Sequence, residues 1–334
     1  MIIDSATLLR SEGPVPLLLA LATDTGVTAY SAWPEAVETG EAAEVLANLE
    51  PLILGREPLE HGALWERMAL TVDWRHEPEP AAAAALSVLD LALWQLAALQ
   101  ASLPLYALLG GRYFPRCDTY VSLTPERKQA SQSPPGGVRI TDSSPARALQ
   151  SAEELRRRWG DQIRLFLQFS EPASDFDDAL RLALRAQATE TFWILDLLPV
   201  EAAAEYRDLG RQVEVPLGAG ARALGLQAFR RLLTEGAVDL LGVDLRRCGG
   251  LTGARQIATF AAAEAVPVAL LGGDWPVDQL LVLHLASTSG IYLPVVRPDD
   301  APGGMPFAHE NGFVTLDNGP LSPAPGSLAA YAPV

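Results

Sequence analysis

The chain has 334 residues, and its 41 acidic and 25 basic side chains give a net charge of −16. The basic set is 24 arginines and a single lysine, Lys128, and it stands beside four histidines and two cysteines. An acidic protein is repelled by phosphate backbones, so this composition excludes a lysine-rich nucleic-acid surface. The two cysteines, Cys117 and Cys248, lie far apart in the sequence and build neither a cysteine-rich zinc site nor a disulfide scaffold.

The sequence shows no signal for export or for a membrane anchor. It begins Met-Ile-Ile-Asp-Ser, without the basic and long apolar segments of a signal peptide. No uninterrupted apolar run reaches the ~20 residues that span a bilayer. Because the cysteines are also sparse, we expect a cytoplasmic protein that binds neither membranes nor nucleic acid.

The first third of the chain is predicted to form strands and then helices. Residues 15–23 and 27–33 have the pattern of two strands joined by a hairpin-type turn at residues 23–26. Residues 35–72 are predicted to be helical. Leucines at spacings of three and four then predict one helix over residues 80–110, ended by a pair of glycines.

In the rest of the chain, strand-like segments alternate with amphipathic helical segments. The predicted strands are Thr119–Leu123, Val138–Thr141, Arg164–Phe169, Phe192–Leu197, Val215–Ala219, Leu240–Val243, Val266–Leu271 and Ile291–Val295. This alternation predicts an α/β fold with a parallel sheet, and the count of eight favours a closed barrel. Residues 124–137, between the first two strands, are rich in proline and glycine, so we do not expect a packed helix there.

Five segments, taken in order, resemble motifs of the enolase superfamily, in its branch of mandelate racemase and muconate lactonising enzymes. They are Leu54-Gly55-Arg56-Glu57-Pro58, residues 86–122, Gly249-Gly250-Leu251-Thr252, His284-Leu285-Ala286 and residues 311–321. The resemblance implies a modified TIM (β/α) barrel with an α+β N-terminal capping domain. We expect the cap in residues 1–112, the barrel in 113–298, and a segment that returns to the cap in 299–334. By analogy with the family, we also expect a homo-oligomer.

The resemblance also implies a chemistry, which is removal of a proton α to a carboxylate. The enediolate that forms is stabilised in the family by Mg²⁺, held by three carboxylates at the ends of the third, fourth and fifth barrel strands. Bases stand on the second, sixth and seventh strands. They are a Lys-x-Lys pair on one side, and a lysine or a His–Asp dyad on the other.

The three positions that align with the metal ligands hold Gln168, Leu195 and Ala221. Mg²⁺ in a protein-built site needs charged oxygen ligands, and none of these residues supplies one. We therefore predict no cofactor, although Mg²⁺ is expected of the family.

The base positions are altered as well. The Lys-x-Lys pair becomes Arg139 and Thr141, and arginine stays protonated near pH 7, so it is a poor base that can still hold a carboxylate. Asp244 falls where the racemase branch has the aspartate of its dyad, and Arg247 falls where a lysine stands. The seventh strand has no histidine to complete the dyad.

Three hypotheses follow for function. In the first, the chain keeps the fold but is not competent for metal-dependent proton abstraction, and it binds a small anion or has a structural role. In the second, it is a metal-independent isomerase, racemase or lyase (dehydratase) that acts on a carboxylate substrate at the barrel mouth. In the third, the alignment slips and a standard metal site is built from other residues, for which the candidates are Asp196, Asp244 and Asp274.

Under the second hypothesis each candidate residue has a role. Asp244, Arg139 and Thr141 occupy the catalytic positions of the family. The residues that would bind the substrate are Arg247, Arg222, Gln168 and Asp274. A small carboxylate or another small anion is the only partner that these residues predict besides a second copy of the chain.

Overall fold

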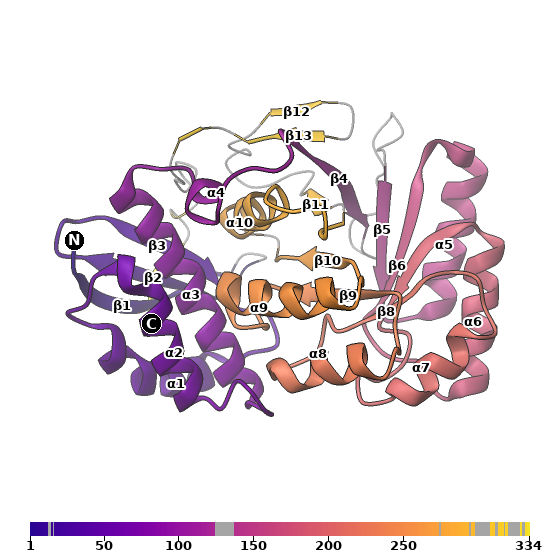
Figure 1. Cartoon of the computed structure of the whole chain (residues 1–334), viewed down its shortest axis with the longest axis horizontal. Coiled ribbons are helices and arrows are strands. Elements are labelled where there is room, and N and C mark those ends of the chain that lie inside the picture. The colour runs from indigo at the N-terminus through magenta and orange to yellow at the C-terminus, as the bar shows by residue number, and fades with distance from the viewer. Residues whose placement is uncertain are drawn as a thin grey trace.

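The computed structural model describes residues 1–12, 15, 17–123, 137–273, 275–293, 295–297, 308–310, 313–316, 318–319, 328 and 331–334. Its N-terminal elements form a capping domain that lies against a β/α barrel (Figure 1). The proline- and glycine-rich connection after the first barrel strand, together with Lys128 and Asp274, lies outside the described residues.

The cap contains a four-stranded antiparallel sheet in the order β14-β1-β2-β3. Its strands are β1 (Ile3–Arg10), β2 (Leu17–Thr23), β3 (Thr28–Ala32) and β14 (Ala332–Pro333). The hairpin predicted at residues 23–26 is present, since the Thr23 amide donates to the Val27 carbonyl at 3.0 Å. Gly26 has a φ of 78°, which a residue with a Cβ rarely adopts.

Helices cover this sheet and connect it to the barrel. They are α1 (Thr39–Ile53), η1 (Pro58–Glu60), α2 (His61–Thr71), α3 (Pro80–Ala101) and α4 (Leu105–Leu108). The prediction of one helix over residues 80–110 was wrong, because α3 ends at Ala101. Ser102 takes a left-handed φ of 54°, and Pro104, which has no amide hydrogen, begins the separate short helix α4.

Helix α3 is the core helix of the cap. By length and composition it is apolar enough to cross a membrane, but 89% of its most apolar window is buried inside the protein. It contacts α1, α2, β2 and β3 of the cap and α9 of the barrel. Helix α3 is apolar on all its faces because neighbouring elements bury it on every side.

The barrel strands run parallel and lie side by side in chain order from β4 to β10. They are β4 (Arg116–Leu123), β5 (Gly137–Asp142), β6 (Arg164–Phe169), β7 (Thr191–Leu195), β8 (Leu217–Ala219), β9 (Leu240–Asp244), β10 (Val268–Leu271) and β11 (Val295–Arg297). The sheet curls back on itself, because β11 pairs with β4 and Tyr292 forms a parallel bridge with Val268. The predicted fold class, a modified TIM barrel with an α+β cap, is confirmed.

The connecting helices pack on the outside of the strands, as Figure 1 shows for α5 to α9. They are α5 (Pro145–Trp159), η2 (Gly160–Gln162), α6 (Phe176–Ala188), α7 (Ala203–Gly210), α8 (Gly225–Thr234), α9 (Gly250–Ala263) and α10 (Pro276–Ala286). Two short strands, β12 (Ala308–Glu310) and β13 (Phe313–Thr315), form a hairpin, and β13 pairs antiparallel with the first residues of β4. The last predicted barrel strand was displaced, because residues 291–293 make only a single bridge and the strand itself is β11.

Side chains on the strands alternate between the helices and the barrel interior. Outward residues such as Val138 and Leu165 belong to the main apolar core. The inward residues form a second apolar cluster of Tyr120, Phe166, Trp193, Leu195, Ala221, Leu240, Ala269 and Leu271. The barrel interior is thus packed with side chains.

The cap holds the barrel through α3, whose residues contact the turn that precedes α9. The Ser87 hydroxyl accepts a hydrogen bond from the Gly249 amide at 2.9 Å, and the Asp90 carboxylate accepts two from Thr252. A carboxylate at a helix N-terminus is favourable because the first amides of the helix have no partner within it. Two of the segments that resemble the family therefore contact each other directly.

Candidate functional site

The carboxyl ends of the barrel strands form the mouth, where we expected the functional residues. Three of the predicted residues lie on inward positions of two neighbouring strands: Arg139 and Thr141 on β5, and Gln168 on β6. The register pairs Thr141 with Gln168 and Gln168 with Leu195, which ends β7. The strands therefore bring these four side chains together.

The residues at two of the three metal-ligand positions are part of the apolar interior. Leu195 is 0% exposed and Ala221 is 5% exposed, and both pack in the cluster with Trp193. Neither side chain has an oxygen, and Gln168 offers one uncharged oxygen, so this donor set does not fit Mg²⁺. Among the described residues, no three His, Cys, Asp or Glu side chains are grouped as metal ligands.

Arg139 extends into the barrel interior, half-buried, and contacts neutral groups. Its guanidinium donates to Gln168 Oε1 at 3.1 Å and to Ser122 Oγ at 3.3 Å. The guanidinium carbon lies 5.9 Å from the centroid of the Tyr120 ring. No carboxylate of the described residues forms an ion pair with Arg139. A partly buried positive charge thus lacks a negative partner within this part of the chain.

The same region of the barrel is rich in hydrogen-bond donors. In the described part of the chain, four groups that can donate are buried without a hydrogen-bond partner: Arg139 Nε, Tyr120 Oη, Thr141 Oγ1 and Trp193 Nε1. One acceptor, Asp196 Oδ2, is unpartnered as well, so donors outnumber acceptors. Burial raises the pKa of Tyr120, while the charge of Arg139 opposes this shift, so the phenol keeps its proton at neutral pH. A buried donor without an acceptor is unfavourable. This arrangement suits a bound acceptor, above all an anion.

Asp196 follows Leu195 and has a left-handed backbone, with a φ of 57°. Strand alternation alone would direct its side chain away from the mouth, but the positive φ interrupts the strand and turns the carboxylate toward the residue that follows β8. Its Oδ1 accepts from the Gly220 amide at 3.0 Å, and the residue is 2% exposed. Burial raises the pKa of Asp196, whereas the charge of Arg222 lowers it.

Arg222, predicted to bind substrate, donates to two backbone carbonyls at strand ends. One belongs to Ser170, at 2.6 Å, and the other to Asp196, at 3.1 Å. Asp196 and Arg222 together therefore tie the ends of β6, β7 and β8. In the family these three strands carry the metal ligands. In this chain the Asp196 carboxylate and the Arg222 guanidinium link their ends through hydrogen bonds.

Across the mouth, Asp244 points inward from the end of β9 and binds Arg246. Asp244 Oδ2 lies 3.3 Å from the Arg246 guanidinium, which also contacts Glu35 of the cap at 2.8 Å. Arg246 is 8% exposed and lies flat against Gly273, where a Cβ would collide with it. Sequence reasoning gave Arg246 and Glu35 no structural role, because nothing in the pattern placed a cap loop beside this turn.

The remaining predicted residue on this side, Arg247, is partly buried and makes no ion pair or side-chain hydrogen bond with the described residues.

Asp278, at the start of α10, is a residue that the sequence analysis did not identify. Its carboxylate accepts from the Ser31 hydroxyl at 3.4 Å and from the Ala32 amide at 3.3 Å, both in the cap. Burial raises the pKa of Asp278 to about 7.

The comparisons with known proteins agree with this architecture. Residues 11–110 match the family "Mandelate racemase / muconate lactonizing enzyme, N-terminal domain", and residues 132–326 match "Enolase C-terminal domain-like". A D-galactonate dehydratase of Ralstonia pickettii (strain 12J) is 29% identical over 292 residues, which cover 80% of this chain and 74% of the relative. A D-galactonate dehydratase family member of Enterococcus gallinarum (strain EG2) is 25% identical over 276 residues, covering 72% and 68%.

Solved structures show the same fold over nearly the whole chain. The 3,6-anhydro-D-galactonate cycloisomerase of Zobellia galactanivorans superposes with a TM-score of 0.83 at 20% identity, covering 96% of this chain and 95% of that one. A racemase of Streptomyces coelicolor A3(2) with bound magnesium has a TM-score of 0.79 at 18% identity, and 96% of each chain is covered. The chain belongs to the enolase superfamily, with the N-terminal domain of the mandelate racemase and muconate lactonising enzymes and an enolase-like C-terminal barrel.

Proposed function

We propose that this chain binds a small carboxylate at the barrel mouth and does not carry out the Mg²⁺-dependent proton abstraction of its family. The observation that carries the proposal is the environment of Arg139. A guanidinium stands where the family has its first lysine, its hydrogen-bond partners are neutral, and its Nε is buried without a partner among the described residues.

A carboxylate complements this group in charge and in geometry. It accepts two parallel hydrogen bonds from one guanidinium, and such charge-assisted bonds are stronger than neutral ones. The hydroxyls of Tyr120 and Thr141 lie on inward positions near Arg139 and offer further donors. The relatives named D-galactonate dehydratases act on a sugar acid, so aldonates are a reasonable first class of ligand to examine.

The residues at the catalytic positions do not support abstraction of a weakly acidic proton. An arginine side chain is a poor proton acceptor, and Thr141 has no base beside it in the contacts described. Leu195 and Ala221 remove the carboxylates that would hold the metal, so the enediolate would lack its Lewis acid. The altered base positions and the altered metal-ligand positions both argue against Mg²⁺-dependent proton abstraction.

A second candidate function is a metal-independent isomerase or lyase, such as a dehydratase, that acts on a carboxylate. The position of Asp244 favours it, because this carboxylate faces the mouth and can be considered as a base. Arg246 occupies both of its oxygens, at 2.9 Å for the backbone amide and 3.3 Å for the guanidinium, which weakens it as a proton acceptor. We therefore rank this function below carboxylate binding. A cytoplasmic location and a homo-oligomer remain predictions.

Calorimetric titration with D-galactonate and other hydroxycarboxylates tests the proposal. We expect binding that is the same with Mg²⁺ and with EDTA, and that Arg139→Gln weakens about tenfold or more. Arg211→Gln is the matched control, since this exposed arginine pairs with Asp208 just after α7, where the chain leads into the start of β8 and away from the mouth. Binding that requires Mg²⁺, or that Arg139→Gln leaves unchanged, contradicts the proposal.

Deuterium exchange at the α carbon, followed by NMR, separates binding from catalysis. We expect no exchange for any acid that binds. Exchange that occurs without metal and is abolished by Asp244→Asn favours the second candidate function. Exchange that requires Mg²⁺ contradicts the proposal, because it is the reaction of the family.

A further inference from the structure

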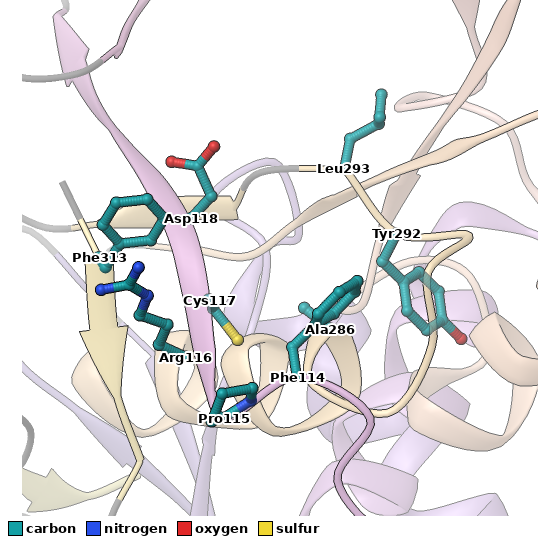
Figure 2. Close-up of a pocket in the computed structure, with 9 residues that line it drawn as sticks. All are labelled: Phe114, Pro115, Arg116, Cys117, Asp118, Ala286, Tyr292, Leu293 and Phe313. Carbon is teal, nitrogen blue, oxygen red and sulfur yellow. The ribbon is translucent and has the colours of Figure 1, made fainter.

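A cavity of about 340 Å³ opens at the opposite end of the barrel, where β4 begins. It is lined by Phe114, Pro115, Arg116, Cys117, Asp118, Ala286, Tyr292, Leu293 and Phe313 (Figure 2). Ser122, the β4 residue that Arg139 contacts, is six residues beyond Arg116, or roughly 20 Å along the strand. This cavity is therefore separate from the mouth.

Aromatic and aliphatic side chains form most of its walls. Figure 2 shows Phe313 on one side and Tyr292 on the other, with Ala286 at the end of α10 beside Tyr292. Phe114 is 41% exposed, although its amide and that of Tyr113 are held by the Ser287 carbonyl at 3.0 and 2.8 Å. The Phe114 ring contacts the exposed Tyr113 ring edge-on, with 4.6 Å between the centroids, so the rim of the cavity carries a contiguous aromatic patch.

The two charged side chains on the wall, Asp118 and Arg116, differ in whether they form an ion pair. Asp118 forms two short hydrogen bonds with Arg164, at 2.6 and 2.7 Å, so its charge is neutralised. Arg116 makes no ion pair with a carboxylate of the described residues, and its guanidinium lies 4.3 Å from the centroid of the Phe313 ring. Stacking on an aromatic face holds a guanidinium in place and leaves its N–H groups free at the edge.

The thiol on the wall does not supply a reactive group. Cys117 donates to the Leu283 carbonyl at 3.5 Å, and burial raises its pKa to about 12, so it stays a protonated, apolar part of the lining. Apolar walls therefore combine with one positive charge that has no acidic partner among the residues that the structure describes. The chemistry complements a ligand with a planar apolar body and one anionic group.

We propose that this cavity is a second binding site, for a small aromatic or aliphatic monocarboxylate whose carboxylate pairs with Arg116 and whose body packs between Phe313 and Tyr292. The volume is adequate for such a molecule, since ligand pockets begin at about 300 Å³. The site is independent of Arg139 and of the function proposed for the mouth.

Titration of 3-phenylpropionate and of its neutral amide, by NMR and calorimetry, tests this site in the full chain. Arg116→Gln is expected to weaken binding of the acid about tenfold, the value of one charge-assisted interaction, and to leave the amide unaffected. Ala286→Leu fills the cavity without a change of charge and is expected to weaken both compounds. Arg158→Gln is the matched control, because Arg158 is an exposed arginine that stacks on Trp159 elsewhere on the surface.

Arg139→Gln distinguishes the two ends of the barrel. If this variant abolishes binding of 3-phenylpropionate while Arg116→Gln does not, the compound binds at the mouth and the second site is refuted. Absence of saturable binding to the unaltered protein, or equal affinity for acid and amide, also refutes it. Arg116 is exposed, so its replacement leaves the fold intact and the result interpretable.

Discussion

Asp90 of the cap accepts both of the hydrogen bonds that Thr252 of the barrel donates. The Thr252 amide lies 2.9 Å from Asp90 Oδ2, and the Thr252 hydroxyl lies 2.7 Å from Oδ1. The Trp94 indole donates to the same hydroxyl at 2.9 Å. One carboxylate on α3 thereby accepts hydrogen bonds from the amide and the hydroxyl of Thr252 in the first turn of α9. This contact joins the cap to the barrel.

Gly250 is predicted to be the residue in this contact that tolerates substitution least. Its φ is 73°, and a Cβ there would collide with the Asp90 carboxylate. We expect Gly250→Ala to lower the free energy of unfolding by more than ~3 kcal/mol, since a left-handed backbone alone costs about 1–2 kcal/mol. Chemical denaturation measures this.

Gly236→Ala is the control for that measurement. Gly236 also has a positive φ, of 58°, but no atom lies within 4 Å of the added Cβ. We expect it to cost only the backbone strain of about 1–2 kcal/mol. Equal losses for the two variants would show that contact with Asp90 is not what constrains Gly250.

Asp278 is predicted to make stability fall as the pH rises. Burial raises its pKa from 3.8 to about 7, and the charge of Arg246 only partly opposes this. Between these pH values the folded protein keeps a proton that the unfolded chain has lost, so the free energy of unfolding decreases with increasing pH and levels off above 7. Asp278→Asn removes this contribution.

Urea unfolding of both proteins at several pH values between 4 and 8 checks the prediction. Asp90 also has a pKa raised to about 7 by burial, but it is present in both proteins and cancels in the difference. We expect the stability difference between the two proteins to change with pH in that window by a few kcal/mol. A difference that is constant with pH contradicts the prediction.

Arg246 is predicted to contribute more to stability than its partner in the cap. Arg246 is 8% exposed, whereas the Glu35 side chain is 56% exposed. Arg246→Met leaves the Asp244 carboxylate without its counter-charge, and we expect a loss of about 3 kcal/mol. Glu35→Gln breaks an ion pair that solvent already screens, and we expect ~1 kcal/mol or less. A double-mutant cycle measures the coupling, and a larger loss for Glu35→Gln would reverse this ranking.

Metal ions are predicted to leave the thermal stability unchanged. A ligand that binds the folded state raises the melting temperature by mass action, and the side chains of Leu195 and Ala221 offer Mg²⁺ no ligand atoms. We expect the same melting temperature in EDTA and in millimolar Mg²⁺. Stabilisation by Mg²⁺ would instead mean that other carboxylates supply a metal site.

Much of the fold and part of the site could be predicted from the sequence. Local periodicity identified the barrel strands from β4 to β10, and strand β6 (Arg164–Phe169) was predicted with its full limits. The ordered motifs identified the superfamily, and strand alternation placed Arg139 and Gln168 on inward positions. The domain limits at residues 112 and 298 remain predictions. Helix and strand ends were less accurate, because a terminus depends on one or two backbone angles, as the left-handed Ser102 shows.

The amino-acid sequence by itself determined the residue types at the positions that align with the metal ligands of the family, and the side chains of leucine and alanine carry no atom that coordinates a metal in any fold. Only the tertiary structure decided what stands in their place. Asp196 and Arg222 link three strand ends, and Arg139 lies beside buried donors that have no partner among the described residues. The cap ion pair of Arg246 with Glu35 joins residues 211 positions apart. Such contacts depend on backbone angles and on the docking of two domains, which no local pattern of residues contains.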